Sequence, residues 1–179
     1  MSTDTTKTTP QHEAARLLGY LQQFRTDRGA LAQLRCGLRR AQQSRAWPLL
    51  ARFGGVPHGD TDHKAAVVLT VAGLWAADPE GRAQGDFGMT CRAMASGEER
   101  AKLSTTGETG PMGRHFQRLL AAERHEICEH VTGVGLRAVA QGVGIHPVLL
   151  YTDLAFWGDR VRERWARSFW AGAEEDAAA

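Results

Sequence analysis

Apolar residues recur every three or four positions along the first part of the chain, which is the spacing of one face of an α-helix. Between His12 and Arg25 this spacing predicts an amphipathic helix whose buried face carries Leu17, Leu18, Leu21 and Phe24. The next segment, separated from the first near 27–29, repeats the spacing with Leu31, Leu34, Leu38 and Ala41. Both segments are therefore predicted to bury one leucine-rich face and to expose the other.

The segment 65–77, AAVVLTVAGLWAA, is apolar on all sides rather than on one. A helix of this kind is packed against neighbours all round, so we expect it at the centre of the fold. Asp62 precedes it as an N-cap, and Asp86 opens a shorter helix in the same way. Residues 96–113 carry little that could be buried and many turn-forming residues, which predicts an exposed loop suited to contacts with another molecule.

Helical spacing continues through the C-terminal half of the chain. It predicts helices on both sides of a break near 122–123, a further helix that starts at Pro147, and a last helix capped by Asp159. No segment alternates between apolar and polar residues as a strand would. The sequence thus predicts an all-α fold, a single compact bundle of about eight helices in residues 11–171, with disordered tails over 1–10 and 172–179, the second of them acidic.

Charge is unevenly distributed along the chain. The formal net charge is +2, but residues 1–10 and 174–179 hold four acidic residues and one lysine, so residues 11–173 carry +5. Arginine supplies 19 of the 22 basic residues. Guanidinium groups suit phosphate and interface contacts, and a GC-rich genome also raises the share of arginine, so composition leaves both explanations open.

The cysteines and the apolar segments indicate the compartment. Cys36, Cys91 and Cys128 lie far apart without CxxC spacing, which argues against a disulfide framework or a zinc ribbon and favours reduced thiols. The N-terminus lacks the pattern of a signal peptide, and the longest apolar stretch is too short to span a bilayer. We therefore expect a cytoplasmic chain that makes no membrane contact.

The segment from Trp157 to Trp170, WGDRVRERWARSFW, sorts into two faces at helical pitch. Its apolar face consists of Val161, Trp165 and Phe169. A narrow arc beside that face holds Arg160, Arg164 and Arg167. Arg35 and Arg39 flank the second leucine-rich face in the same manner. Such rows suit the phosphates of a nucleic-acid backbone, and a solvated helix face with local ion pairs is the alternative.

The tryptophans offer a second class of nucleic-acid contact, because aromatic rings can stack on bases. Trp75, Trp157 and Trp165 lie on apolar helical faces, which favours core packing for them. Trp47 and Trp170 are undecided between the two roles.

Signatures of catalysis are weak. The loop HGDTDH at 58–63 offers His58, Asp60, Asp62 and His63 as ligands of a divalent ion for phosphodiester cleavage, and its alternative is a polar loop in which Asp62 only caps the next helix. The histidines of HEICEH at 125–130 are five apart, about 140° around a helix, and do not aim at one metal. Phosphate-binding glycine loops and a nucleophile elbow are missing. We expect no catalytic residue, metal or cofactor.

Six segments occur in a recognisable order: GALAQLRCGLRRA, WPLLARFGG, HKAAVVLTVAGLWA, GMTCRAM, GRHFQRLLAAER and PVLLYTDLAFWGDRVRERWARSFW. Over about residues 17–170 the chain resembles the CasB family, the small subunit of the type I-E CRISPR Cascade surveillance complex. The resemblance implies an all-helical protein without catalytic activity, present as two copies arranged head to tail. It implies CasC backbone subunits, the CasA large subunit, CRISPR RNA and target DNA as partners, with a basic surface that helps to hold the unwound target.

By position, the resemblance implies that this surface includes Arg35, Arg92, Arg114, Arg124, Arg160 and, at a looser match, Arg137. The helical faces add Arg39, Arg118, Arg164 and Arg167. We expect these side chains to form one continuous positive strip on the outside of the bundle. The chain departs from the family pattern at 103–113, where relatives are more basic.

The leading hypothesis is a non-catalytic Cascade subunit that stabilises RNA-guided unwinding of target DNA by binding backbones without sequence preference. One alternative is a metal-dependent nuclease or phosphohydrolase that uses the 58–63 loop. The other is a protein scaffold whose arginines all face acidic groups of partners.

Overall fold

The computed structural model describes residues 9–81, 83 and 85–171, in which no strand occurs. Its ten α-helices confirm the all-α prediction and exceed the expected number by two. The helices are α1 (Pro10–Leu21), α2 (Arg28–Cys36), α3 (Trp47–Leu50), α4 (His63–Ala77), α5 (Phe87–Met94), α6 (Gly97–Thr105), α7 (Pro111–Ala121), α8 (Ile127–Ala140), α9 (Pro147–Ala155) and α10 (Asp159–Trp170). Of the predicted tails, 1–8 and 172–179 lie outside the described residues, and Pro10 already belongs to α1.

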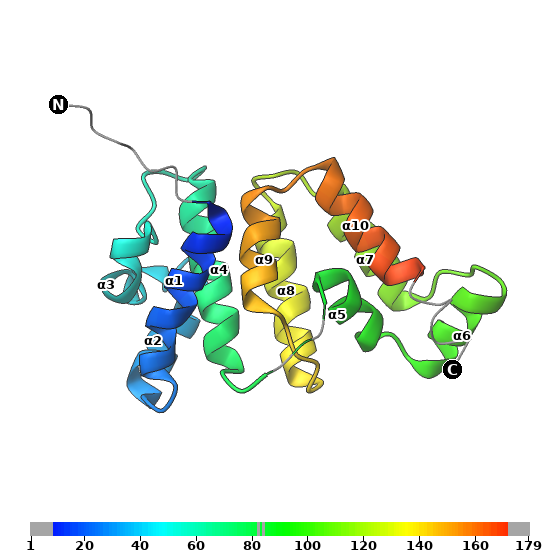
Figure 1. The fold of residues 1–179 in the computed structure, drawn as a ribbon, viewed down its shortest axis with the longest axis horizontal. Coiled ribbons are helices and arrows are strands. Elements are labelled where there is room, and N and C mark those ends of the chain that lie inside the picture. The colour runs from blue at the N-terminus through cyan, green and yellow to red at the C-terminus, as the bar shows by residue number, and fades with distance from the viewer. Residues whose placement is uncertain (1–8, 82, 84, 172–179) are drawn as a thin grey trace.

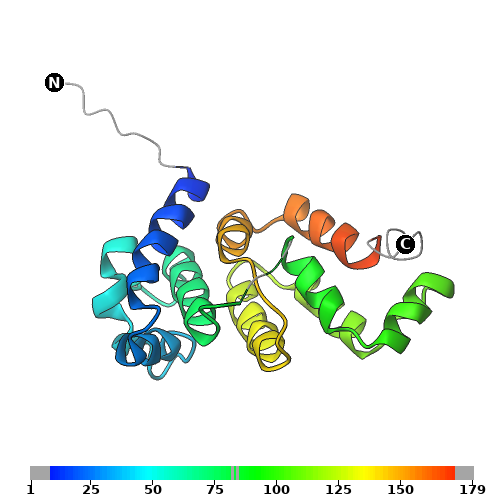
Figure 2. The ribbon, with the colours of Figure 1, turned by 60° about the horizontal axis from the view of Figure 1, so that its bottom comes forward.

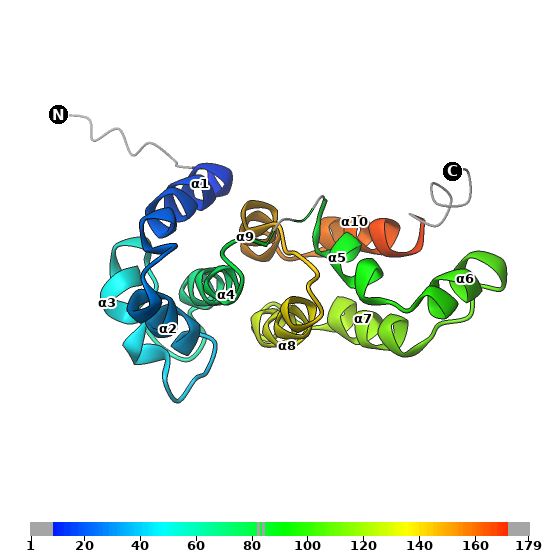
Figure 3. The ribbon, with the colours of Figure 1, turned by 90° about the horizontal axis from the view of Figure 1, so that it is seen from below.

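The helices form two layers with α4 and α5 between them (Figures 1, 2 and 3). In the view from below, α1, α9 and α10 lie along one side, and α2, α8 and α7 lie along the other (Figure 3). One hydrophobic cluster is continuous through both layers, from Ala14 of α1 to Phe169 of α10. The two layers consequently share a single core, and each presents its outer side to solvent.

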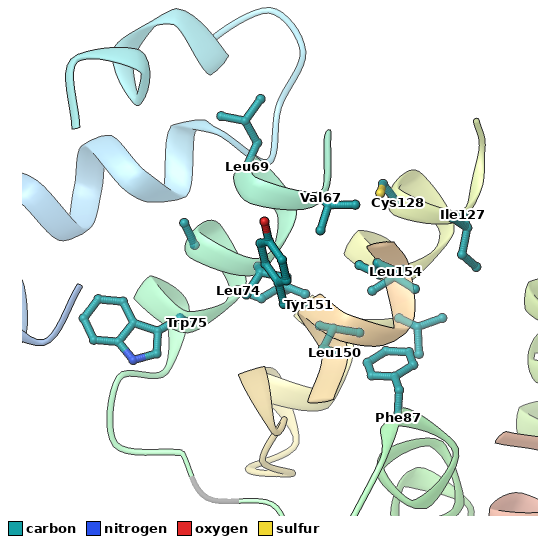
Figure 4. Close-up of a cluster of buried hydrophobic side chains, with 14 of the residues drawn as sticks. Val67, Leu69, Leu74, Trp75, Phe87, Ile127, Cys128, Leu150, Tyr151 and Leu154 are labelled. Atoms are coloured by element: carbon teal, nitrogen blue, oxygen red, sulfur yellow. The ribbon is translucent and has the colours of Figure 1, made fainter. Parts of the chain in front are cut away.

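Helix α4 is the buried centre of the N-terminal half, as its all-round apolar sequence predicts. Every residue from Val67 to Ala76 is buried, and α4 contacts α1, α2, α8 and α9. Figure 4 shows its side chains beside those of α8 and α9, including Leu150 and Leu154. Asp62 is its N-cap, and the carboxylate accepts a hydrogen bond from the Ala65 amide at 3.1 Å. No helix among the described residues combines the length and apolar character needed to cross a membrane.

Several helix ends differ from those predicted. Helix α1 ends at Leu21 and continues as one 3₁₀ turn (Gln22–Phe24), and α2 ends at Cys36 instead of continuing to Ala41. After α2 the chain turns so that Leu38 packs on Gly73 of α4, where a Cβ would lie 2.5 Å from the leucine side chain. This close approach thus accompanies the early end of α2. Asp159 is the first residue of α10, not its cap.

The loop predicted at 96–113 is wrong, because α6 occupies half of the segment and α7 begins within it at Pro111. Ser96 caps α6 by accepting a hydrogen bond from the Glu99 amide at 3.1 Å. Glu99 itself is only 7% exposed. Its carboxylate accepts hydrogen bonds from the amides of Met112 (3.3 Å) and Gly113 (2.9 Å) at the start of α7. A carboxylate at a helix N-terminus satisfies free amides and the helix dipole. A polar contact therefore holds a segment that has little apolar surface to bury.

Candidate nucleic-acid interface

Helix α10 has the two faces that its sequence predicts. Val161, Trp165 and Phe169 are each at most 5% exposed, and they pack the helix onto the core. Arg160 and Arg167 are exposed on the other side. Among the residues that the structure describes, neither guanidinium has a carboxylate partner. These two arginines, called the α10 face below, are free to bind an external anion.

Arg164 lies between them in the helix but serves a different purpose. It is paired with the Asp153 carboxylate of α9, and its Nε lies 3.6 Å from Oδ2 of Asp86, the N-cap of α5. The indole N–H of Trp165 also donates to Asp153, at 2.6 Å. Burial raises the pKa of the Asp153 carboxyl, although the hydrogen bonds from Trp165 and Arg164 act against the shift. Arg164 thus links three helices, and we remove it from the candidate interface.

The second basic surface lies on the layer of α2, α8 and α7. Phe116 of α7 stacks on Phe169 of α10, with ring centroids 4.3 Å apart, so the exposed side of α7 points away from α10. That side carries Arg118, which has no partner within the described chain, and Arg114, which donates to the nearby Thr109 carbonyl at 3.2 Å. Arg118 is consequently the better placed of the two for contact with an external phosphate.

Helices α2 and α8 extend this surface towards the N-terminal half. Arg35 and Arg39 line a shallow groove of about 250 Å³ that also involves Leu136 of α8. Arg137 follows Leu136 and is exposed. None of these three arginines forms an ion pair with another described residue. The name rear face below denotes this set, which consists of Arg35, Arg39, Arg114, Arg118 and Arg137.

The α10 face and the rear face lie on opposite sides of the molecule, since α10 belongs to one layer and α2, α7 and α8 belong to the other (Figures 1 and 3). The single continuous strip expected from the sequence is therefore wrong. Helical periodicity places side chains on one helix, but it does not say on which side of the core the helix packs.

Arg92 does not reach either face. Its side chain is buried, with the residue 4% exposed, and Nη1 donates to the Phe169 carbonyl at 2.9 Å. The carbonyl belongs to the last turn of α10, where a cation is favourable. The structure thus places Arg92 inside the protein as a contact between α5 and α10, contrary to the surface position expected from the sequence.

Arg124 lies in the link between α7 and α8, on neither basic face. It is exposed, and Nη2 donates to the Ala155 carbonyl at the end of α9 at 3.0 Å. The link between α7 and α8 thus runs beside the end of α9. Arg124 therefore connects the α7–α8 link to the end of α9, and the rest of its guanidinium can still bind an external anion.

The polar side chains of the 58–63 loop bind to separate partners. Asp60 pairs with Arg40 at 2.6 Å, and Nε2 of His63 lies 2.7 Å from the Leu154 carbonyl. The hydrogen bond from the His58 amide, followed by that from the Ala65 amide, lowers the pKa of the Asp62 carboxyl. Burial lowers the pKa of His63. The described residues contain no group of three or more His, Cys, Asp or Glu side chains placed to hold a metal ion, so this loop does not form the metal site that the nuclease hypothesis requires.

The comparisons with known proteins agree with this fold. A model of the family described as CRISPR-associated protein Cse2 matches residues 30–170. The chain belongs to the CasB/Cse2 family. CasB from Thermus thermophilus, known from a crystal structure, is 24% identical to this Cse2-family chain with a TM-score of 0.63, over 88% of this chain and 97% of that one. A chain of a CRISPR RNA-guided surveillance complex is 17% identical with a TM-score of 0.69, over 94% and 98%. No curated protein matches.

The tryptophans that the sequence assigns to the core of this Cse2-family chain are buried, and the structure adds one exposed phenylalanine. Trp75, Trp157 and Trp165 are buried in the core. Trp170 packs on Phe116, with ring centroids 5.3 Å apart. The addition is Phe156, which is 59% exposed. The sequence contains a signal for this exposure, because Phe156 lies outside the helical spacing of the apolar residues Leu150, Leu154 and Trp157.

Proposed function

We propose that this chain is a non-catalytic small subunit of the type I-E Cascade surveillance complex and stabilises the opened target DNA by binding nucleic-acid backbones. Membership of the CasB/Cse2 family and the likeness to a chain of an RNA-guided surveillance complex support this assignment. The observation that carries the binding role is the presence of exposed arginines, without carboxylate partners in the described chain, on two faces of a rigid helical core.

A small number of such contacts is sufficient for this role. Replacing a DNA duplex by an RNA–DNA hybrid is nearly balanced in free energy, so modest contacts to the backbones decide how long the opened state lasts. A guanidinium held on a packed helix loses little freedom when it binds a phosphate, and it can do so in a bidentate manner. Each face therefore adds attraction without sequence preference.

The proposed partners follow from the same assignment. Two copies of the chain arranged head to tail would bridge the CasC backbone subunits and the CasA large subunit, next to CRISPR RNA and target DNA in the cytoplasm. Basic faces on opposite sides of one chain suit this position, because one face can meet nucleic acid while the other meets either a second strand or acidic groups of a neighbour.

The salt dependence of binding tests whether the exposed arginines contact phosphates. In titrations of the full chain with a single-stranded DNA oligonucleotide, the double variant Arg160→Ala with Arg167→Ala is expected to lower the slope of log affinity against log salt by about 1.4, or about 0.7 per lost contact. The pair Arg118→Ala with Arg137→Ala reports on the rear face in the same way.

The matched control is Arg25→Ala with Arg40→Ala. It removes the same charge, but Arg25 and Arg40 are already paired with Glu80 and Asp60. The control is expected to keep the wild-type slope. If both α10-face and rear-face variants also kept it, neither face would bind phosphate, and the binding role would have to be abandoned.

A further inference from the structure

Phe156 is the most exposed large apolar side chain among the described residues, at 59%, compared with 42% for Leu136 and 38% for Met89. It caps the C-terminus of α9 and comes directly before the link to α10. Its ring contacts no other aromatic ring in the part of the chain that the structure describes. Exposure of this size leaves most of the apolar ring in water, where a ligand that covers it gains free energy.

The backbone on both sides of Phe156 is fixed. The Phe156 amide donates to the Thr152 carbonyl at 3.1 Å, and the preceding Ala155 carbonyl accepts from Arg124 at 3.0 Å. The indole of the following Trp157 is buried and donates to the Ala122 carbonyl at 3.0 Å. Phe156 is therefore an exposed ring on a rigid base, which loses little conformational freedom when it is covered.

Two exposed arginines belong to chain segments that adjoin Phe156. Arg124 is bonded to the residue immediately before Phe156, and Arg160 follows it by four residues in the first turn of α10. The nearby carboxylate of Asp159 is already paired with Arg162 at 3.2 Å. Positive charge on the segments that adjoin an exposed aromatic ring favours a ligand that carries a flat apolar surface and negative charge together, as a nucleotide does, over an uncharged apolar partner surface.

We propose that Phe156 stacks on an unpaired base of the displaced DNA strand, while Arg124 and Arg160 bind the adjacent phosphates. The inference rests on the proposed function. In an RNA-guided opened target the displaced strand has lost its complementary strand, so its bases are unpaired. Stacking tolerates any base, which agrees with binding that has no sequence preference.

Three substitutions separate stacking from other apolar contacts. In titrations of the full chain with single-stranded DNA, Phe156→Ala is expected to weaken binding about 5- to 150-fold. Phe156→Leu keeps an apolar side chain without a ring and should bind as weakly as the alanine variant, whereas Phe156→Trp should bind at least as tightly as wild type. The salt slope should be unchanged in all three, because no charge is altered. Met89→Ala, which removes another exposed apolar side chain, should bind like wild type.

If Phe156→Leu bound single-stranded DNA as tightly as wild type, stacking would be overturned, because an apolar side chain without a ring would be sufficient. If wild type binds with a steep salt slope and Phe156→Ala binds equally tightly, this inference is overturned and the proposed function stands. Absence of any salt-dependent binding by wild type would overturn both.

The strand is identified in the assembled complex with a 2-aminopurine probe, whose fluorescence is quenched when it stacks. The probe should be quenched in the displaced strand by wild type and not by Phe156→Ala. Dependence on Phe156 only when the probe is in the target strand would contradict the assignment.

Discussion

Replacing Arg164 with alanine is expected to lower the free energy of unfolding by about 3 kcal/mol, since it removes one partner of a buried ion pair. Arg164 is half-exposed, but the Asp153 side chain that it pairs with is only 3% exposed and cannot turn to water. After the substitution that carboxylate keeps only the Trp165 indole as a side-chain hydrogen-bond partner among the described residues. The measurement is chemical denaturation of the full chain at neutral pH.

Arg160→Ala and Arg167→Ala are the matched controls, because they remove the same side chain from the same helix at exposed positions without carboxylate partners in the described chain. Each should change stability by less than about 0.5 kcal/mol. Adding Asp153→Asn to Arg164→Ala should recover part of the loss, because the uncompensated charge is removed. Equal stability of all three single variants would show that Arg164 does not hold the helices together.

The loss of folding stability caused by Arg164→Ala depends on pH in a definite direction. The pKa of Asp153 is raised in the folded protein, so its protonated form favours folding and its ionised form opposes it. The stability that this group contributes is present below its unfolded pKa and is lost as the pH rises through its folded pKa. The Arg164→Ala variant should therefore lose less stability in acid than at neutral pH, which denaturation at two pH values measures.

Gly88→Ala is expected to cost about 2 to 3 kcal/mol, because the added methyl group has no room between α5 and α10. A Cβ at Gly88 would lie 2.4 Å from the Trp165 carbonyl oxygen and 2.9 Å from the Trp165 Cα, both backbone atoms that cannot move without shifting α10. The Trp165 ring also packs on Phe87, with centroids 5.3 Å apart. Thermal or chemical denaturation gives the loss directly.

Gly133→Ala provides the comparison, because Gly133 lies within α8 and a Cβ there would have no neighbour within 4 Å. This substitution should stabilise the protein by about 0.5 to 1 kcal/mol, as alanine is the better helix former. If Gly88→Ala were as stable as wild type, the close approach of α5 to α10 would be incorrect.

Local patterns in the sequence were sufficient for most helices, and contacts between distant residues account for the differences. Patterns between residues at most four positions apart predict that α4 is buried on all sides, that Asp62 caps it, and that α10 has an apolar and a basic face. Helix α6 does not, because Glu99 is held by amides of α7 that lie 13 and 14 residues further along. Polar contacts at that separation leave no periodic signal in the chain.

The candidate site shows the same division. Sequence spacing correctly placed Arg160 and Arg167 on the solvent side of α10, but it treated Arg164 as their equivalent. The difference is set by Asp153 and Asp86, which approach Arg164 from two other helices. Burial of Arg92 likewise depends on where the end of α10 lies relative to α5. Which arginines are free is therefore decided by tertiary packing.

The most direct test of the central claim is the lifetime of the opened target in a reconstituted complex that contains CRISPR RNA and the other Cascade proteins. With a subunit that lacks Arg118, Arg137, Arg160 and Arg167 through alanine substitution, the lifetime should fall at least about tenfold, equivalent to about 1.4 kcal/mol, while assembly is unchanged. The Arg25→Ala with Arg40→Ala control should retain the wild-type lifetime. An unchanged lifetime in a fully assembled complex would contradict the account and favour a scaffold that does not act on DNA.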